Sequence, residues 1–305
     1  MPIFPRDLID AGRVLTILEV RHCTTYRYAN PVTFGEHRMM FRPRDSHDLR
    51  LLETGLTISQ PCTVRWLHDV FGNSIAIAKF DAPGQELTFE SYFRAEHYPS
   101  TPEEIVIEPF AEQLPFSYAA DEIPDLGRRA QRQYPDPEHA VDIWAKGFLE
   151  DGQRRGTLDL LQAMSQAIKS DFSYARREEP GIQDPVETLQ LRQGSCRDFA
   201  VLMMEAVRSL GMAAQFVSGY LYDESLVEAE GGMVGGGETH AWLQVYLPGA
   251  GWVDFDPTNA LTGGRNLIRV AVARDAAHAA PLTGSFTGTP SDYLGMTVDV
   301  TVTAQ

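Results

Sequence analysis

Apolar residues recur with the period of an α-helix after Cys196. Ser195 is a good N-cap residue, and Gly211 stands just past the last apolar position, where a left-handed C-terminal cap is expected. The pattern predicts one amphipathic helix that begins at Cys196 and carries this thiol in its first turn. The apolar stripe, with spacings i, i+3, i+4, i+7, i+8 and i+11, consists of Phe199, Leu202, Met203, Ala206, Val207 and Leu210.

A period of two dominates residues 14–98. From Leu18 to Arg21, for example, apolar and charged residues alternate strictly, and turn residues at 70–74 separate two further runs. Several short strands with no convincing helix between them are typical of a β-sandwich. We therefore expect residues 14–98 to form an N-terminal antiparallel β-sandwich domain.

Prolines change the pattern after this region. Seven prolines between residues 99 and 137 interrupt any long element, so residues 99–154 are predicted to be a proline-rich connector with short helices. A helical stripe then follows Thr157, its expected N-cap, and another helix is expected at Asp184, an N-cap residue followed by proline. These helices open a second domain, predicted over residues 155–280. The fold class expected is α+β, with helices packed on an antiparallel sheet.

Two strands joined by a tight turn are expected at residues 238–247 and 251–256. Each strand has one apolar face, and the two apolar faces coincide only if the loop has an odd number of residues or a bulge intervenes. A three-residue turn at 248–250 satisfies this condition and pairs Leu247 with Gly251.

This register also decides which carboxylate lies beside His240. Asp256 is diagonal to His240 on the same face of the hairpin, within side-chain reach. Asp254 is two residues nearer the turn and too far away. The alternation therefore selects Asp256 as the partner of His240.

Two stretches outside these elements carry further expectations. Residues 281–305 form a C-terminal tail in which residues 296–302 alternate as a strand, and this strand is placed to return to the N-terminal sheet. A glycine-rich acidic stretch at 228–238 is not expected to hold regular structure. It is either a mobile lid or a plain flexible connection.

Composition narrows the class of protein. The chain has 305 residues, 43% of them hydrophobic, and a formal net charge of −16 with no basic stripe, which argues against nucleic-acid binding. No apolar run is long enough for a membrane span, and the first residues lack the pattern of a signal peptide. The cysteines, Cys23, Cys62 and Cys196, form no pair or zinc spacing, which suits a reducing compartment. We expect a cytoplasmic protein without a metal or other cofactor.

Cys196, His240 and Asp256 together suit nucleophilic chemistry at an amide carbon. The free N–H groups and the dipole at a helix N-terminus favour a thiolate at Cys196. His240 takes the thiol proton and later gives it to the leaving amine, while Asp256 orients the imidazole and stabilises its charged form. The backbone N–H of Cys196 is a candidate donor to the oxyanion. Each residue alone is more often structural, so the joint pattern carries the prediction.

Four motifs in the second domain resemble the bacterial transglutaminase-like superfamily, whose members include proteins named as cysteine proteases. The resemblance covers residues 155–275 and implies a papain-like core with the catalytic triad Cys196, His240 and Asp256. The motifs are Gly194-Ser195-Cys196-Arg197-Asp198-Phe199-Ala200, Val217-Ser218-Gly219-Tyr220, Thr239-His240-Ala241-Trp242 and Gly251-Trp252-Val253-Asp254-Phe255-Asp256-Pro257-Thr258.

The first domain resembles the β-rich region that precedes this core in such bacterial proteins, through His22-Cys23-Thr24-Thr25-Tyr26-Arg27-Tyr28 and Asp69-Val70-Phe71-Gly72-Asn73. Ala273 stands where the family usually has glycine, outside the triad. Within the motifs, Tyr220 either lines an acyl pocket or packs in the core. Trp242 shares the face of His240 and is a candidate wall of the cleft. Asp198 is expected to stabilise the start of its helix.

The predicted reaction is acyl transfer from a peptide or isopeptide amide through a thioester, with a peptide or protein as substrate. Hydrolysis and transamidation share this intermediate and differ in whether water or an amine resolves it. We favour a peptidase or amidase, because no second pocket for an amine is identifiable. A transglutaminase and a non-catalytic binding module that keeps the fold are the alternatives. The sequence does not indicate the oligomeric state.

Overall fold

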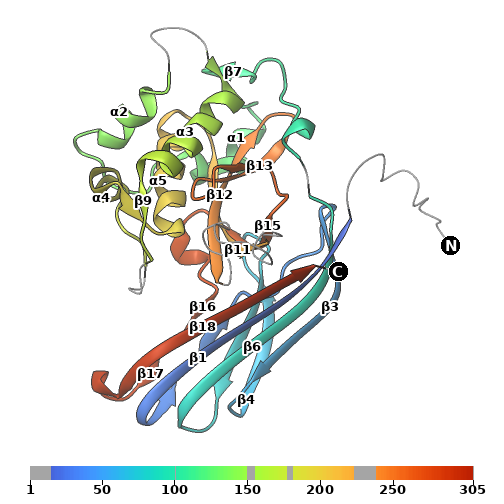
Figure 1. Cartoon of the computed structure of the whole chain (residues 1–305), viewed down its shortest axis with the longest axis vertical. Coiled ribbons are helices and arrows are strands. Elements are labelled where there is room, and N and C mark those ends of the chain that lie inside the picture. Colours follow the sequence, from blue (N-terminus) through green and yellow to red (C-terminus); the bar gives the residue numbers. More distant parts are fainter. Residues whose placement is uncertain (1–14, 100, 150–154, 177–180, 223–237, 305) are drawn as a thin grey trace, which may run out of the picture.

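The computed structural model describes residues 15–99, 101–149, 155–176, 181–222 and 238–304. Its lower half in Figure 1 is a β-sandwich, and its upper half packs helices on an antiparallel sheet. This architecture confirms the predicted fold class. The glycine-rich stretch at 228–238 lies outside the described residues, apart from Glu238.

Strand β1 (Thr16–Phe34) is the centre of the larger sheet of the sandwich. It pairs antiparallel with β6 on one side and with β18 on the other, so that Leu18 faces both Ala95 and Ala304. Residues 293–304 thus return to the N-terminal sheet (Figure 1). The sheet has the order β17-β1-β6-β3, with β18 also on β1; its other strands are β3 (Leu49–Ile58), β6 (Gly84–His97), β17 (Phe286–Thr287) and β18 (Tyr293–Ala304).

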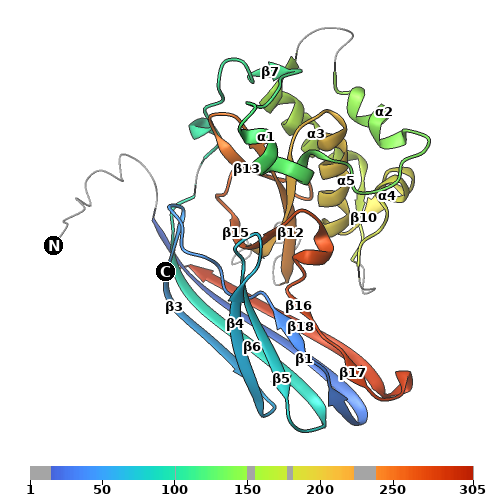
Figure 2. The same ribbon diagram turned by 180° about the vertical axis from the view of Figure 1, so that it is seen from behind.

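The second sheet of the sandwich lies in front in Figure 2 and has the order β16-β2-β5-β4. Apolar side chains from both sheets, among them Phe34, Met39, Ala78 and Phe89, fill the space between them. This is the alternating inward-facing pattern of a sandwich. The four strands are β2 (His37–Met39), β4 (Cys62–His68), β5 (Ser74–Phe80) and β16 (Leu282–Thr283).

The upper half is built on the sheet β14-β13-β12-β11-β15, whose strands all pair antiparallel. Helix α5 packs on β12 and β11, and α3 and α4 pack on α5. The strands are β11 (Ala214–Leu221), β12 (Thr239–Leu247), β13 (Gly251–Asp256), β14 (Leu261–Thr262) and β15 (Leu267–Ala273), and the helices are α3 (Thr157–Asp171), α4 (Pro185–Leu191) and α5 (Cys196–Ser209). Shorter elements are β9 (Ser173–Tyr174), β10 (Gln193–Gly194), η5 (Ala276–His278) and η6 (Pro290–Asp292).

The proline-rich residues 101–149 wrap around this upper half. They contain the short helices expected there, and α2 contributes the fully buried Val141 and Ala145 to the same core as α5. The elements are η2 (Pro102–Glu104), β7 (Gln113–Leu114), α1 (Glu122–Leu126), η3 (Gly127–Ala130) and α2 (Ala140–Lys146), and β7 pairs with β8 (Arg155–Gly156).

Helix α5 has the ends that its sequence predicts. It begins at Cys196 after the N-cap Ser195, and Gly211 beyond its C-terminus has a φ of 87°, in the left-handed region that glycine favours. Asp184 caps α4 by accepting a hydrogen bond from the backbone of Val186. The cap predicted for α3 is wrong: Thr157 is the first helical residue, and its hydroxyl donates to the carbonyl of Ala111.

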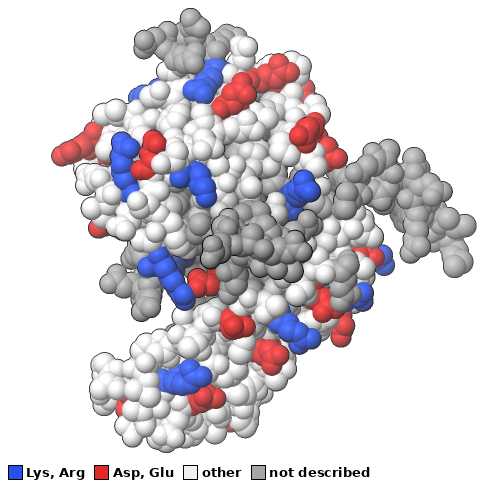
Figure 3. Space-filling view, viewed as in Figure 1, with Lys and Arg blue, Asp and Glu red and all other residues white. Residues whose placement is uncertain are grey.

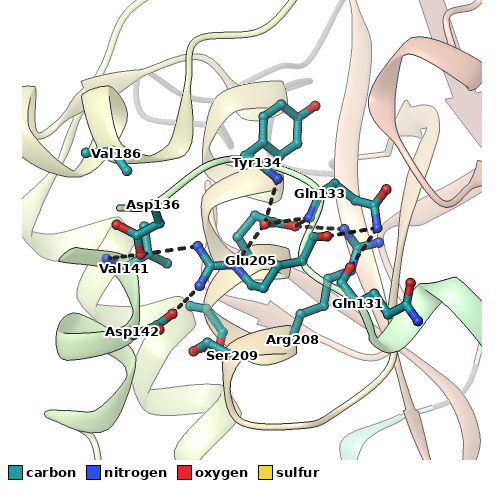
Figure 4. Close-up of polar contacts among 12 residues, drawn as sticks. Gln131, Gln133, Tyr134, Asp136, Val141, Asp142, Val186, Glu205, Arg208 and Ser209 are labelled. Carbon is teal, nitrogen blue, oxygen red and sulfur yellow. Dashed lines mark hydrogen bonds and ion pairs between the residues drawn. The ribbon is translucent and has the colours of Figure 1, made fainter. Parts of the chain in front are cut away.

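The polar side of α5 is also buried, whereas a simple amphipathic helix exposes its polar side to solvent. Glu205 is 0% exposed and accepts hydrogen bonds from Arg132, from Arg208 and from the backbone N–H groups of Gln133 and Tyr134 (Figure 4). Buried charges are tolerated only when they are paired and hydrogen-bonded in this way. The network fastens the connector to the middle of α5.

The two halves meet through a mixed junction. An apolar cluster joins the sandwich to β11 and β15 and includes Leu18, Phe93, Tyr220, Ile268 and Val300. Asn73, which ends the Asp69–Asn73 motif, adds a pair of strand-like bonds: its amide donates to the carbonyl of Val272 at 2.7 Å and accepts from that residue's N–H at 2.9 Å. The motif therefore supplies a partner to the edge strand β15.

The surface carries no dominant patch of one charge on the face drawn in Figure 3, where acidic and basic side chains are interspersed. Among the described residues, no helix is long and apolar enough to cross a membrane.

Candidate active site

The thiol of Cys196 sits at the start of α5, where a buried carboxylate fixes the turn. Asp198 is 0% exposed, and one of its oxygens accepts hydrogen bonds from the backbone N–H and the hydroxyl of Ser195, both at 2.8 Å. Its other oxygen accepts from the N–H of Gln183 at 2.7 Å. Asp198 thus stabilises the helix start, as expected. Cys196 itself is 7% exposed, and first-turn N–H groups like its own have no partner within a helix.

His240 and Asp256 are brought together by the predicted hairpin. Leu247 pairs with Gly251 across a three-residue turn, which confirms the register. His240 lies on β12 and its Nε2 bonds Asp256 Oδ2 at 2.8 Å, with both side chains buried. Asp256 also accepts from the backbone N–H of Thr258 and from the amide of Asn259.

Neighbouring charges dominate the protonation of this pair. Burial by itself would lower the pKa of His240, but the charge and hydrogen bond of Asp256, together with Cys196, raise it above its ordinary value. Burial likewise opposes ionisation of Asp256, but His240 and Asn259 hold the pKa of that carboxyl below its usual range. The arrangement therefore favours an imidazolium beside a carboxylate.

The second ring nitrogen of His240 is the one available to the thiol. Nδ1 is buried and has no hydrogen-bond partner of ordinary geometry among the described residues, while Cys196 is near enough to affect the imidazole's pKa. With Nε2 donating to Asp256, the neutral ring presents a lone pair at Nδ1, which is where a general base must accept a thiol proton.

Tyr174 is a residue of the site that the sequence patterns did not reveal. Strand β9 pairs with β10, which places Tyr174 beside Gly194, two residues before Cys196. Burial raises the pKa of Tyr174, and the charges of Cys196 and Glu238 raise it further, so its hydroxyl stays protonated. Its side chain is partly open to solvent. Two-residue strands have no periodicity to detect, and this contact depends on tertiary structure.

An ion pair borders the same side of the site. Arg176 Nη1 lies 2.5 Å from Glu238 Oε1, two residues before His240. The charges of Arg176 and Glu238 both act on Tyr174. Tyr174, Arg176 and Glu238 thus form a polar rim on the β9 side of Cys196.

Two residues assigned to substrate contact, Tyr220 and Trp242, are buried. Tyr220 is 2% exposed in the junction between the halves, and its hydroxyl hydrogen-bonds His22 Nδ1 at 2.9 Å. Core packing, the second of its two predicted roles, is what the structure shows. Trp242 is 0% exposed; it lies beside His240, and its indole N–H donates to Asp254 Oδ1 at 2.6 Å.

The described part of the chain contains no group of three or more histidine, cysteine, aspartate or glutamate side chains placed to hold a metal ion. The three side chains that do converge, Cys196, His240 and Asp256, are a thiol, an imidazole and a carboxylate, whose chemistry suits a nucleophile, a base and an orienting group. This is the set required for acyl transfer through a thioester.

Comparison with family models assigns both halves of the chain. Residues 147–257 match the model of the transglutaminase-like superfamily core, and residues 18–96 match the bacterial transglutaminase-like N-terminal region.

Similar proteins extend over nearly the whole chain. An uncharacterized protein of Mycobacterium tuberculosis (strain ATCC 25618 / H37Rv) is 30% identical over 296 residues, which cover 92% of this chain and 91% of that protein. An uncharacterized protein of Mycobacterium leprae is 27% identical over 93% of this chain and 98% of its own length. Among solved structures, a "putative cysteine protease" from Cytophaga hutchinsonii superposes with a TM-score of 0.65 at 19% identity, covering 95% of this chain and 91% of that one. The likeness to that structure concerns the fold.

Proposed function

Because this chain belongs to the bacterial transglutaminase-like superfamily, we propose that it is a cysteine peptidase or amidase in which Cys196 attacks a peptide or isopeptide amide. The observation that carries the proposal is the buried His240, bonded through Nε2 to Asp256 and left with Nδ1 available toward Cys196. A structural histidine normally has partners at both ring nitrogens when it is buried.

The proposed reaction runs in two halves. The thiol proton first passes to His240 Nδ1, which gives a thiolate–imidazolium pair. Cys196 Sγ then bonds the amide carbon, and the oxyanion receives a hydrogen bond from the backbone N–H of Cys196. The carbon–nitrogen bond then breaks, and the imidazolium gives its proton to the departing amine. Water, deprotonated by the same imidazole, attacks the thioester, which releases the carboxylic acid and restores the thiol. Asp256 stays ionised throughout and stabilises the imidazolium of His240 each time it forms.

Transamidation is the second candidate, because the matching family is named for it. There a primary amine replaces water in the second half, and an amide forms in place of the acid. The rim at Tyr174, Arg176 and Glu238 is the side from which we expect either acceptor to approach.

Incubation with a peptide library, with and without a primary amine such as cadaverine, tests the proposal. Cleaved peptides detected by mass spectrometry support a peptidase, and amine adducts on glutamine would replace it with a transferase. The Cys196→Ala variant, checked for an unchanged melting temperature, must abolish either product. Products that survive in this variant, or a wild-type protein that makes none, would count against catalysis and for a binding module.

The proposal includes two further expectations from the sequence. The partner is a peptide or protein substrate, and the compartment is the cytoplasm, where the three free cysteines stay reduced. Cell fractionation of the native protein, followed by alkylation of its free thiols, checks the second expectation. Recovery in an oxidising compartment would contradict it.

A further inference from the structure

The indole ring of Trp242 lies beside the imidazole ring of His240. The two residues are two positions apart on β12, so their side chains share one face of the strand. Their rings are nearly parallel, at an interplanar angle of 26° with centroids 6.0 Å apart. The bond from His240 Nε2 to Asp256 fixes one end of the imidazole, but small rotations about χ1 and χ2 would still tilt the ring plane and turn the Nδ1 lone pair away from Cys196. A neighbouring ring that cannot move restricts this rotation.

Trp242 is itself held by a second carboxylate. Its indole N–H donates to Asp254 Oδ1 at 2.6 Å, and both residues are buried. Gly219 leaves the room that the indole occupies, because a Cβ there would lie 2.8 Å from Trp242 Cη2. The indole is therefore held in one position, by the hydrogen bond of its N–H to Asp254 and by the close approach of its Cη2 to the backbone of Gly219.

Asp254 connects this arrangement to the sandwich. It borders a cavity of about 10 Å³ together with Arg44, Asp48, His97 and Arg269, about the space of a single water molecule. Arg269 lies 3.3 Å from both oxygens of Asp48, a residue of the sandwich. Burial raises the pKa of Asp254, and the charge of Arg269 opposes that rise.

We propose that Trp242 and Asp254 are positioning residues, in which the carboxylate anchors the indole and the indole holds the imidazole of His240 in the plane that serves Cys196. This inference rests on the proposed function, since it assigns a role in the activation of the same thiol. Asp254 thus has a task different from that of Asp256: it acts on the tryptophan rather than on the histidine.

The pH profile of Cys196 alkylation by iodoacetamide, read by mass spectrometry on the full chain, tests the proposal without a substrate. Trp242→Phe removes the indole N–H, and Asp254→Leu removes its acceptor. Each is expected to slow alkylation near pH 6.5 roughly 10- to 100-fold, the loss that a misplacement of about 1 Å produces, and to shift the profile toward that of His240→Ala. Asp254→Asn keeps an oxygen acceptor for the indole and is expected to retain the wild-type profile.

Two matched controls separate positioning from general loosening of the hairpin. Trp252→Phe changes a tryptophan of β13 that packs on Tyr246, and Val253→Ala shortens the neighbour of Asp254 on the opposite face. Both are expected to keep the wild-type profile. Profiles of Trp242→Phe and Asp254→Leu that match wild type, controls that shift as far as these variants, or an Asp254→Asn variant as slow as Asp254→Leu would overturn the proposal.

If Trp242→Phe does not fold, as judged by circular dichroism, the comparison of Asp254→Asn with Asp254→Leu decides alone. A His240→Ala variant whose alkylation profile equals that of the wild type is a different outcome. It overturns the proposed function itself, whatever the result for Trp242. For peptide cleavage, the positioning role predicts a fall in kcat with little change in KM, because the substrate's binding contacts are untouched.

Discussion

Burial works against the charge of an imidazole, yet the groups around His240 favour that charge. Asp256 supplies the compensation through a 2.8 Å hydrogen bond, and the carboxylate is itself satisfied by Thr258 and Asn259. At the scale of single residues, the protonation states of His240 and Asp256 are therefore coupled, because each side chain shifts the pKa of the other.

Replacing Asp256 by asparagine tests this dependency. Without the carboxylate the pKa of His240 falls, so the imidazolium is lost at lower pH and the alkaline limb of the rate profile moves to lower pH. The rate constant for peptide cleavage is expected to fall by a factor on the order of 10³ to 10⁴, as when the carboxylate of a Ser-His-Asp triad is replaced. The exposed Asp159→Asn serves as the control. An Asp256→Asn profile with an unmoved alkaline limb would contradict this assignment.

The order in which the cysteines react is a second test at this scale. Cys196 is the most buried of the three, whereas Cys23 and Cys62 are half-buried, so exposure alone predicts that Cys196 reacts last. Burial and Asp81 raise the pKa of the Cys62 thiol. We expect iodoacetamide at neutral pH to modify Cys196 first, because His240 is placed to take its proton and the thiol lies at a helix start. Mass-spectrometric detection of Cys23 or Cys62 as the first site would show that no activated thiolate exists.

At the scale of elements, α5 serves two functions. Its first turn presents Cys196, while its middle holds Glu205 in a buried network that fastens residues 132–134 to the helix. These interactions resist any shift of α5 along its axis, because such a shift would separate Glu205 from its three donors outside the helix, Arg132 and the backbone N–H groups of Gln133 and Tyr134.

The Glu205→Gln variant is expected to lower the free energy of unfolding by about 3–5 kcal/mol, because it leaves Arg208 charged and buried without its carboxylate. Urea denaturation followed by circular dichroism measures this. Arg50→Gln, which breaks an exposed pair with Glu96, is expected to change stability by about 1 kcal/mol or less. Equal losses in both variants would mean that the Glu205 network adds nothing beyond a surface ion pair.

Sequence patterns predicted the elements whose signals are local. The stripe and caps of α5 and the parity of the hairpin 238–256 were correct because both depend on residues close in the chain. Patterns did not reveal that Glu205 is buried, since its partner Arg132 lies 73 positions away. Tyr174 was missed for the same reason. Strand parity correctly placed Trp242 on the same face of the strand as His240, but parity does not predict whether a side chain on that face is exposed or buried.

At the scale of the whole molecule, the junction between the halves combines apolar packing with two buried histidines. His22 hydrogen-bonds Tyr220 across the junction, and His97 lies beside Asp48 and Arg269. Burial lowers the pKa of each from 6.5 to about 4. Since the folded state disfavours their charged forms, both stabilise the fold above about pH 6.5, and this contribution is lost as the pH falls toward 4.

The protein is therefore expected to lose stability between pH 6.5 and 4, by about 3 kcal/mol at most for each histidine. Urea midpoints of the wild type and of the His22→Asn and His97→Asn variants, measured at pH 7.5, 6 and 5, check this. Each variant should show a flatter dependence on pH than the wild type. Parallel curves for all three proteins would show that these histidines do not titrate with unfolding.

The pairing of β18 with β1 bears on the order of events during synthesis. Strand β1 meets β6 early, but its other edge waits for residues 293–304. At roughly 5–20 residues per second, that edge stays open for about 15 to 55 seconds of translation. Throughout this interval Val20, His22 and Thr24 present an unpaired strand to other nascent chains. The same pairing that joins the halves in the mature protein makes the first-made strand one of the last to be covered.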